Sequence, residues 1–188
     1  MKIHSFILGF LPWIVIIPFP SDTMGWGALL GFLVAVAQLG LNRRRGTPVN
    51  AMILDFGSAA FLLALSVFGF LAPHSGLLAA NDVLSFAWLA LIAFASMAVG
   101  RPFTMGMARR QVPQNVWDSA DFRRTHQAIT RIWGISFAGL AVALGMVRIA
   151  DLGIAVGLPV RLVGLAIPFV LTVRAVKAIR ARTELVQR

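Results

Sequence analysis

The residues with the clearest chemical potential are Asp55, Ser58 and Arg131, which stand inside segments that are otherwise apolar. Asp55 follows Pro48 by seven residues, which on a helix places it about 10 Å inside its segment. Ser58 lies one helical turn later, on the same face. A carboxylate inside a membrane is costly unless it is paired or hydrated, so we expect Asp55 to face other helices and to pair with Arg131.

Two interpretations of this group stay open. Asp55 is either a proton or ion site within a cavity, or a structural carboxylate that is paired with arginine or kept wet near the headgroups. The pairing with Arg131 requires the neighbouring segments to be helices that place Arg131 at a depth similar to that of Asp55.

The residue types argue against most enzyme classes. The chain has no cysteine, and its histidines, His4, His74 and His126, lack the helical spacing of metal ligands. There is no glycine-rich phosphate loop, no G-x-S-x-G element and no pair of acidic residues on one helix face suited to acid–base catalysis. We therefore expect a protein that is not an enzyme, with no catalytic residue, no metal and no cofactor.

Composition indicates a membrane protein. Hydrophobic residues make up 59% of the 188 residues and charged residues only 13%, whereas soluble domains are close to half apolar and a quarter charged. The net charge of +10 falls between apolar runs, which favours a role in topology and contact with anionic lipid headgroups over binding to nucleic acid.

Six apolar runs are long enough to cross a bilayer, which takes about 20 residues. The sequence therefore predicts an all-α bundle of six transmembrane helices forming a single domain over residues 1–188. The expected spans cover residues 3–20, 23–41, 48–71, 82–99, 128–147 and 152–173. A basic hinge at 100–127 and a basic tail at 174–188 complete the chain, and the tail is expected to continue the last helix. Asp118, with Asp121 three residues later, resembles a capping box and predicts that the fifth helix begins before its apolar span. Asp22, Asp82 and Asp151 each stand just before an apolar run and are expected to be helix caps rather than a cation site.

The basic residues predict the orientation of these spans. With six spans, 15 of the 17 Lys and Arg residues fall on one side of the membrane, and only Arg148 and Arg161 fall on the other. The positive-inside rule then places both termini in the cytoplasm of a multi-pass protein of the bacterial inner membrane.

The basic clusters on the cytoplasmic side are expected to contact lipid. The hinge pairs apolar Phe103 and Met107 with arginines, which predicts a re-entrant or interfacial elbow lying on the inner leaflet. A plainer interpretation, that the arginines only fix topology, stays open. The residues expected at anionic headgroups are Arg43, Arg44, Arg45, Arg109 and Arg110.

The hinge also resembles the bacterial intracellular septation protein A family. The resemblance lies in a basic residue followed by proline, a short spacer, a Pro-x-x-Val-Trp element, and a tryptophan in the next span, with Phe-Leu-Pro in the first span. The matching residues here are Arg101, Pro102, Pro113, Val116, Trp117 and Trp133, together with Pro12. The resemblance implies a small inner-membrane protein linked to envelope synthesis and septation, without an established catalytic activity or cofactor.

Two functional hypotheses follow. The first is a non-enzymatic inner-membrane protein that supports cell-envelope synthesis or cell division through anionic lipids and other envelope or division membrane proteins. The second is a small transporter or channel that uses Asp55. An enclosed polar cavity leading to Asp55 would favour transport, and a closed bundle with exposed grooves would favour the first hypothesis.

Overall fold

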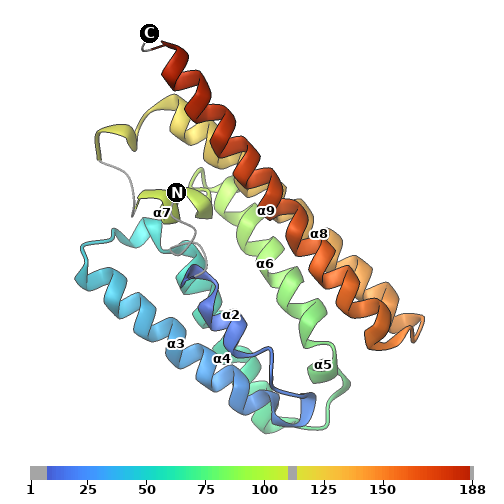
Figure 1. The fold of residues 1–188 in the computed structure, drawn as a ribbon. Helices are drawn as coiled ribbons and strands as arrows, with labels where there is room; N and C mark the ends of the chain where they lie inside the picture. Colours follow the sequence, from blue (N-terminus) through green and yellow to red (C-terminus); the bar gives the residue numbers. More distant parts are fainter. Residues whose placement is uncertain (1–7, 110–113, 187–188) are drawn as a thin grey trace.

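The computed structural model describes residues 8–109 and 114–186, with side chains placed as far as Arg174, and this part of the chain contains helices but no strand. Five of its helices are long and apolar enough to cross a membrane (Figure 1). This confirms an all-helical protein with several membrane-compatible helices. These are α3 (Met24–Arg44), α4 (Ile53–Leu71), α6 (Asn81–Ala98), α8 (Ala120–Ile149) and α9 (Gly153–Val186).

The long helices form two groups, with α3 and α4 on one side and α6, α8 and α9 on the other (Figure 1). Successive long helices run in opposite directions. One end of the bundle, called here the basic end, carries the loop after Arg44, the 3-10 helix Val49–Ala51, α7 (Phe103–Arg109) and the start of α8. The opposite end carries the loop before α5 (Gly76–Ala79) and the turn between α8 and α9.

The first predicted span differs from the expectation. In its described part, Leu8 and Gly9 are helical and a turn at Phe10 separates them from the short helix α2 (Leu11–Val15). Pro12 occupies the first turn of α2, as proline favours. The segment runs antiparallel to α3, because Gln38 Nε2 donates to the Leu8 carbonyl at 2.6 Å while Phe19 packs at Gly27. The five long helices therefore do not include this segment, and its residues 3–7 lie outside the described part.

Glycines allow the first group to pack closely. A Cβ added at Gly69 of α4 would lie 2.6 Å from the Cα of Gly25 in α3. Beside this contact, Ser66 Oγ donates to the Gly25 carbonyl at 3.0 Å. In lipid the hydrophobic effect does not drive helices together, and small residues that let the backbones approach closely are a common feature of helix contacts there.

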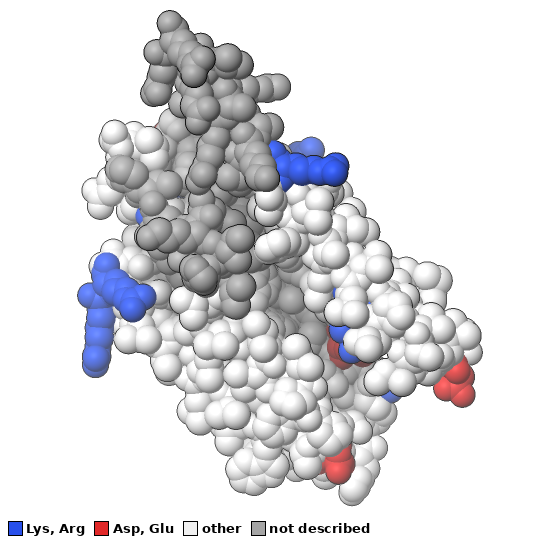
Figure 2. Space-filling model, in the orientation of Figure 1, with Lys and Arg blue, Asp and Glu red and all other residues white. Residues whose placement is uncertain are grey.

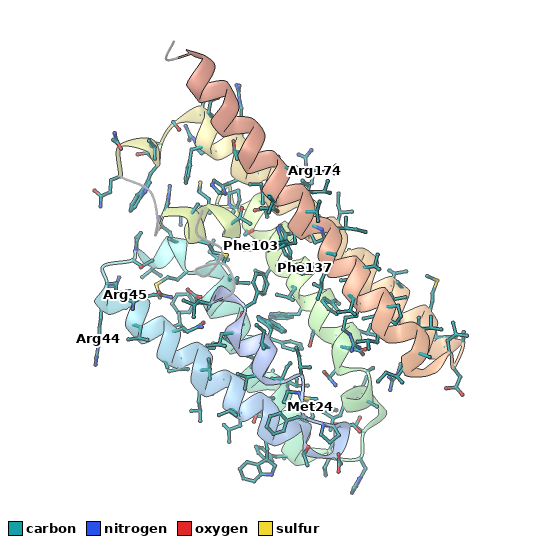
Figure 3. All side chains as sticks on the ribbon, viewed as in Figure 1. Met24, Arg44, Arg45, Phe103, Phe137 and Arg174 are labelled. Atoms are coloured by element: carbon teal, nitrogen blue, oxygen red, sulfur yellow. The ribbon has the colours of Figure 1, made fainter. Side chains whose placement is uncertain are left out.

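Aromatic side chains fill the space between the two groups. Trp13 stacks on Phe61 at 5.2 Å, and Phe61 lies 5.7 Å from Trp88. On the other side Trp133 and Phe137 have ring centroids 5.3 Å apart, and Phe137 projects into the middle of the bundle (Figure 3). Offset and edge contacts between aromatic rings stabilise a packed interior by more than the burial of their apolar surface alone.

The hinge is partly a buried element. All residues from Phe103 to Ala108 are buried against other parts of the chain, so the apolar side of α7 packs on protein, and the predicted position of the hinge at the inner leaflet stays a prediction. The close approach of α7 is possible because Gly106 faces the Ala51 carbonyl so closely that no Cβ would fit.

The early start of the next helix and the helical tail are confirmed. α8 begins at Ala120, where Ser119 Oγ caps it by accepting from Phe122 N at 3.2 Å. α9 continues through the basic tail to Val186. Ser119 is the cap, not the predicted neighbour Asp118, because its hydroxyl reaches the third amide of the first turn.

Candidate functional site

Asp55 lies in the first turn of α4 and is only 3% exposed. Its Oδ2 accepts a hydrogen bond from Asn42 Nδ2 of α3 at 3.2 Å. Ser58, on the same face, is also buried and accepts from the indole nitrogen of Trp13 at 2.8 Å. The carboxylate thus faces other protein segments, as expected, and a polar group from the neighbouring helix satisfies part of its hydrogen-bonding capacity.

The structure does not bring Arg131 to Asp55. Arg131 is exposed on α8, in the second group of helices, whereas Asp55 is buried on α4 in the first group. Asn42 is one partner of Asp55 and Arg131 is not, because α3 is the immediate neighbour of α4 and α8 is not.

An ion pair instead joins α6 and α9 near the opposite end. Arg161 donates through an Nη2–H to Asp82 Oδ2 at 2.6 Å, and both side chains are partly exposed. Asp82 Oδ1 also accepts from Val83 N at 2.8 Å, in the first turn of α6. The sequence treated Asp82 as a helix cap only. The signal that could have found the pair is Arg161, a cation inside an apolar span, which requires a partner.

A partly open pocket of about 480 Å³ lies at the basic end. It lies between the C-terminal turns of α3 and the hinge, and its volume falls within the range of small-molecule sites. Its described walls combine two arginines, three amide side chains and apolar groups. The lining residues are Leu8, Gln38, Leu41, Asn42, Arg45, Gly46, Thr47, Pro48, Arg109, Gln114 and Trp117.

Arg109 is the most constrained of the basic residues in this pocket. Its guanidinium carbon lies 5.4 Å from the centroid of the Trp117 ring, a cation–π distance. Its Nε is buried and has no hydrogen-bond partner in the described part of the chain. Arg45, at the end of α3, is exposed and is the second cation among the lining residues.

Three buried polar side chains form a cluster between α7 and α8. Thr104 Oγ1 lies 2.7 Å from Thr130 Oγ1 and 3.2 Å from His126 Nδ1. These groups satisfy one another, which is typical of a structural cluster. Within residues 8–109 and 114–186, no three His, Asp or Glu side chains lie close enough to hold a metal ion.

The residues of the hinge motif are spread over several environments. Arg101 is exposed and Pro102 is buried, directly before α7. Val116 is exposed and Trp117 half-buried. Trp133 is buried, and its Nε1–H donates to Thr172 Oγ1 at 3.0 Å, a hydrogen bond that links α8 to α9. Pro113 and Arg110 lie outside the described residues.

Of the arginines expected at headgroups, the four that the structure describes lie at the basic end: Arg43, Arg44, Arg45 and Arg109. Arg43 and Arg44 are exposed in the last turn of α3, and Arg44 and Arg45 lie at the edge of the bundle in Figure 3. On the face drawn in Figure 2, charged groups stand toward the ends and an uncharged surface lies between them. The exposed hydrophobic side chains of that surface are the expected contacts of lipid chains.

We found no family model, curated protein or solved structure that matches this chain.

Proposed function

We propose that this protein is a non-enzymatic membrane protein that contacts anionic lipids through its basic end and supports cell-envelope synthesis or septation in the bacterial inner membrane. The observation that carries the lipid part is the gathering of arginines at one end of an apolar helix bundle. The envelope part is supported by the resemblance of Arg101-Pro102 and Val116-Trp117 to the septation protein A family.

The physical basis of the lipid contact is the charge of the inner leaflet. Each Lys or Arg near an anionic membrane surface adds about 1 kcal/mol of attraction at moderate ionic strength. Arg43 and Arg44 are exposed in the last turn of α3, and Arg123 and Arg124 are exposed in the first turns of α8. Both pairs therefore lie where α3 and α8 reach the basic end of the bundle.

Depletion of the protein in its host tests the envelope part. Cells that lack the chain should become longer or leak periplasmic content under low osmotic strength, and the wild-type chain should restore them. A chain with Arg43→Gln and Arg44→Gln should restore them only in part if its lipid contact matters. Unchanged cell length and envelope integrity on depletion would contradict the proposal.

Transport through the bundle is the second candidate, and one observation favours it. Asn42 both lines the pocket at the basic end and donates to the buried carboxylate of Asp55. A path from water to Asp55 would therefore pass Asn42. Proteoliposomes holding a pH-sensitive dye, with H⁺, Na⁺ and K⁺ gradients imposed in turn, test this candidate. Transport predicts a flux that Asp55→Asn abolishes, and an absence of flux for the wild type rejects it for these ions.

A further inference from the structure

The pocket at the basic end has the composition of an anion site. Its described walls carry two guanidinium groups, from Arg45 and Arg109, and no carboxylate. Guanidinium groups present planar N–H donors that match the oxygens of phosphate, often two at a time. We propose that this pocket binds the phosphate group of a phosphate ester between Arg45 and Arg109, an inference that rests on the proposed contact with anionic lipid and specifies its site.

Arg109 is already positioned to receive an anion. Trp117 lies over its guanidinium at 5.4 Å, and the α7 helix that carries it is buried at every position from Phe103 to Ala108. A side chain held in one place loses less entropy when it binds. The buried Nε of Arg109 has no partner in the described part of the chain, and leaving such a donor unsatisfied is costly. A phosphate oxygen would satisfy it.

The polar groups on the other wall separate the proposed anion from the nearby carboxylate. Asn42 lines the pocket and donates to Asp55. Gln38 also lines the pocket, and its amide nitrogen is engaged by the Leu8 carbonyl. These amides shape the wall and hold α3 to its neighbours, while the positive charge facing the pocket comes from the arginines. The site therefore selects an anion.

The position of the pocket indicates what else the ligand carries. Leu41 lines the pocket and is 50% exposed, and Leu33 and Val36 extend the exposed apolar surface along α3 toward the middle of the bundle. A phosphate at Arg45 and Arg109 would leave an attached apolar chain beside this surface, at the level of the headgroups. A volume of about 480 Å³ also exceeds what a phosphate alone would fill. The shared chemistry is a phosphate ester, whose source is either a lipid headgroup or a small soluble ester.

Binding measurements on the full chain in nanodiscs of phosphatidylcholine test the site. The probes are a short-chain phosphatidylglycerol, glycerol phosphate and inorganic phosphate, each titrated at constant ionic strength. The site predicts saturable binding that Arg109→Gln weakens at least tenfold and that Arg109→Lys restores only in part. Arg45→Gln should weaken binding several-fold. Arg124→Gln is the matched control, because it removes an exposed arginine at the same end that does not line the pocket.

The outcomes separate the possibilities. Binding of the short-chain lipid without competition by glycerol phosphate identifies a lipid headgroup, and equal competition identifies a soluble ester. Equal binding of the short-chain lipid by Arg45→Gln, Arg109→Gln and Arg124→Gln contradicts a phosphate site in the pocket. If all three variants still bind anionic lipid, the proposed function is unaffected. If the wild-type chain binds no anionic lipid, the lipid contact of the proposed function is contradicted as well. If Arg109→Gln melts early, Arg45→Gln decides alone, because the Arg45 side chain is exposed and its replacement should leave the fold intact.

Discussion

Arg161 and Asp82 form a 2.6 Å ion pair that joins α9 to α6 near the opposite end of the bundle. The side chains are 37% and 28% exposed, respectively, so water and salt reduce the strength of the pair. The helix α9 has few buried residues within its apolar span, and this pair is one of two polar contacts described between it and the rest of the bundle. The other is the bond from Trp133 to Thr172.

Removing either charge of this pair should lower the free energy of unfolding by about 0.2–1 kcal/mol, the range for partly exposed ion pairs. Asp82→Asn, Arg161→Gln and the double variant form a thermodynamic cycle, measured by thermal unfolding in mild detergent. The coupling should shrink in high salt. Asp151→Asn is the control, since Asp151 is exposed with a φ of 50°, a backbone conformation that asparagine tolerates. A coupling of zero at low salt would show that the pair contributes nothing.

The contact between α3 and α4 at Gly25 and Gly69 predicts a sharper effect. Gly69→Ala should lower the free energy of unfolding by about 1–3 kcal/mol, as overpacking does, because the new Cβ would meet the Gly25 backbone at 2.6 Å. Backbone atoms cannot swing aside as the end of a side chain can.

Gly139→Ala provides the matched control for Gly69→Ala. Gly139 lies within α8, and a Cβ there would meet nothing within 4 Å. Its replacement should leave stability unchanged or raise it by about 0.5–1 kcal/mol through the lower entropy of the unfolded chain. Equal effects of the two substitutions on the midpoint of thermal unfolding would show that the helices separate easily.

The helix boundaries could be predicted because they depend on local chemistry. The apolar run after Pro48 predicted α4, although the 3-10 turn Val49–Ala51 delays its start to Ile53. The polar residues before the fifth span predicted the early start of α8 at Ala120. The first expected span is not among the five long apolar helices of the described residues, since apolar composition alone does not reveal that the chain turns after Val15.

The contacts that build the candidate site could not be predicted, because they join distant segments. Asp55 has its observed partner in Asn42, a polar residue near the end of a different helix. Spacing within α4 and α8 suggested Arg131 at a similar depth, but depth does not say which helices are neighbours. The pocket likewise depends on α7 being buried, which brings Arg109 toward Arg45 and Trp117.

The predicted orientation can be tested with single cysteines, since the natural chain has none. Asn50→Cys lies at the basic end and His74→Cys in the loop at the opposite end, and both positions are exposed. In intact cells, a membrane-impermeant maleimide should label His74→Cys, and Asn50→Cys should react only after the membrane is opened. The positive-inside rule gives this result. Labelling of Asn50→Cys alone in intact cells would reverse the orientation, and labelling of both would reject the membrane arrangement.

The bond between Trp13 and Ser58 predicts how much the short α2 segment depends on a single polar contact. Trp13 Nε1 donates to Ser58 Oγ at 2.8 Å, and both residues are buried. Trp13→Phe would keep an aromatic ring near Phe61, with which Trp13 stacks, while removing the donor. We expect a loss of about 1–3 kcal/mol in the free energy of unfolding, because the hydroxyl of Ser58 would lose a buried partner.

A second substitution separates the lost hydrogen bond from the lost ring volume. Adding Ser58→Ala to Trp13→Phe removes the stranded hydroxyl and should recover part of the stability. Trp26→Phe is the control, because Trp26 is 63% exposed and makes an edge contact with Phe70. Thermal unfolding followed by circular dichroism checks all three variants against the wild type. If Ser58→Ala gives no recovery, the cost of Trp13→Phe comes from packing against Phe61 rather than from the hydrogen bond to α4.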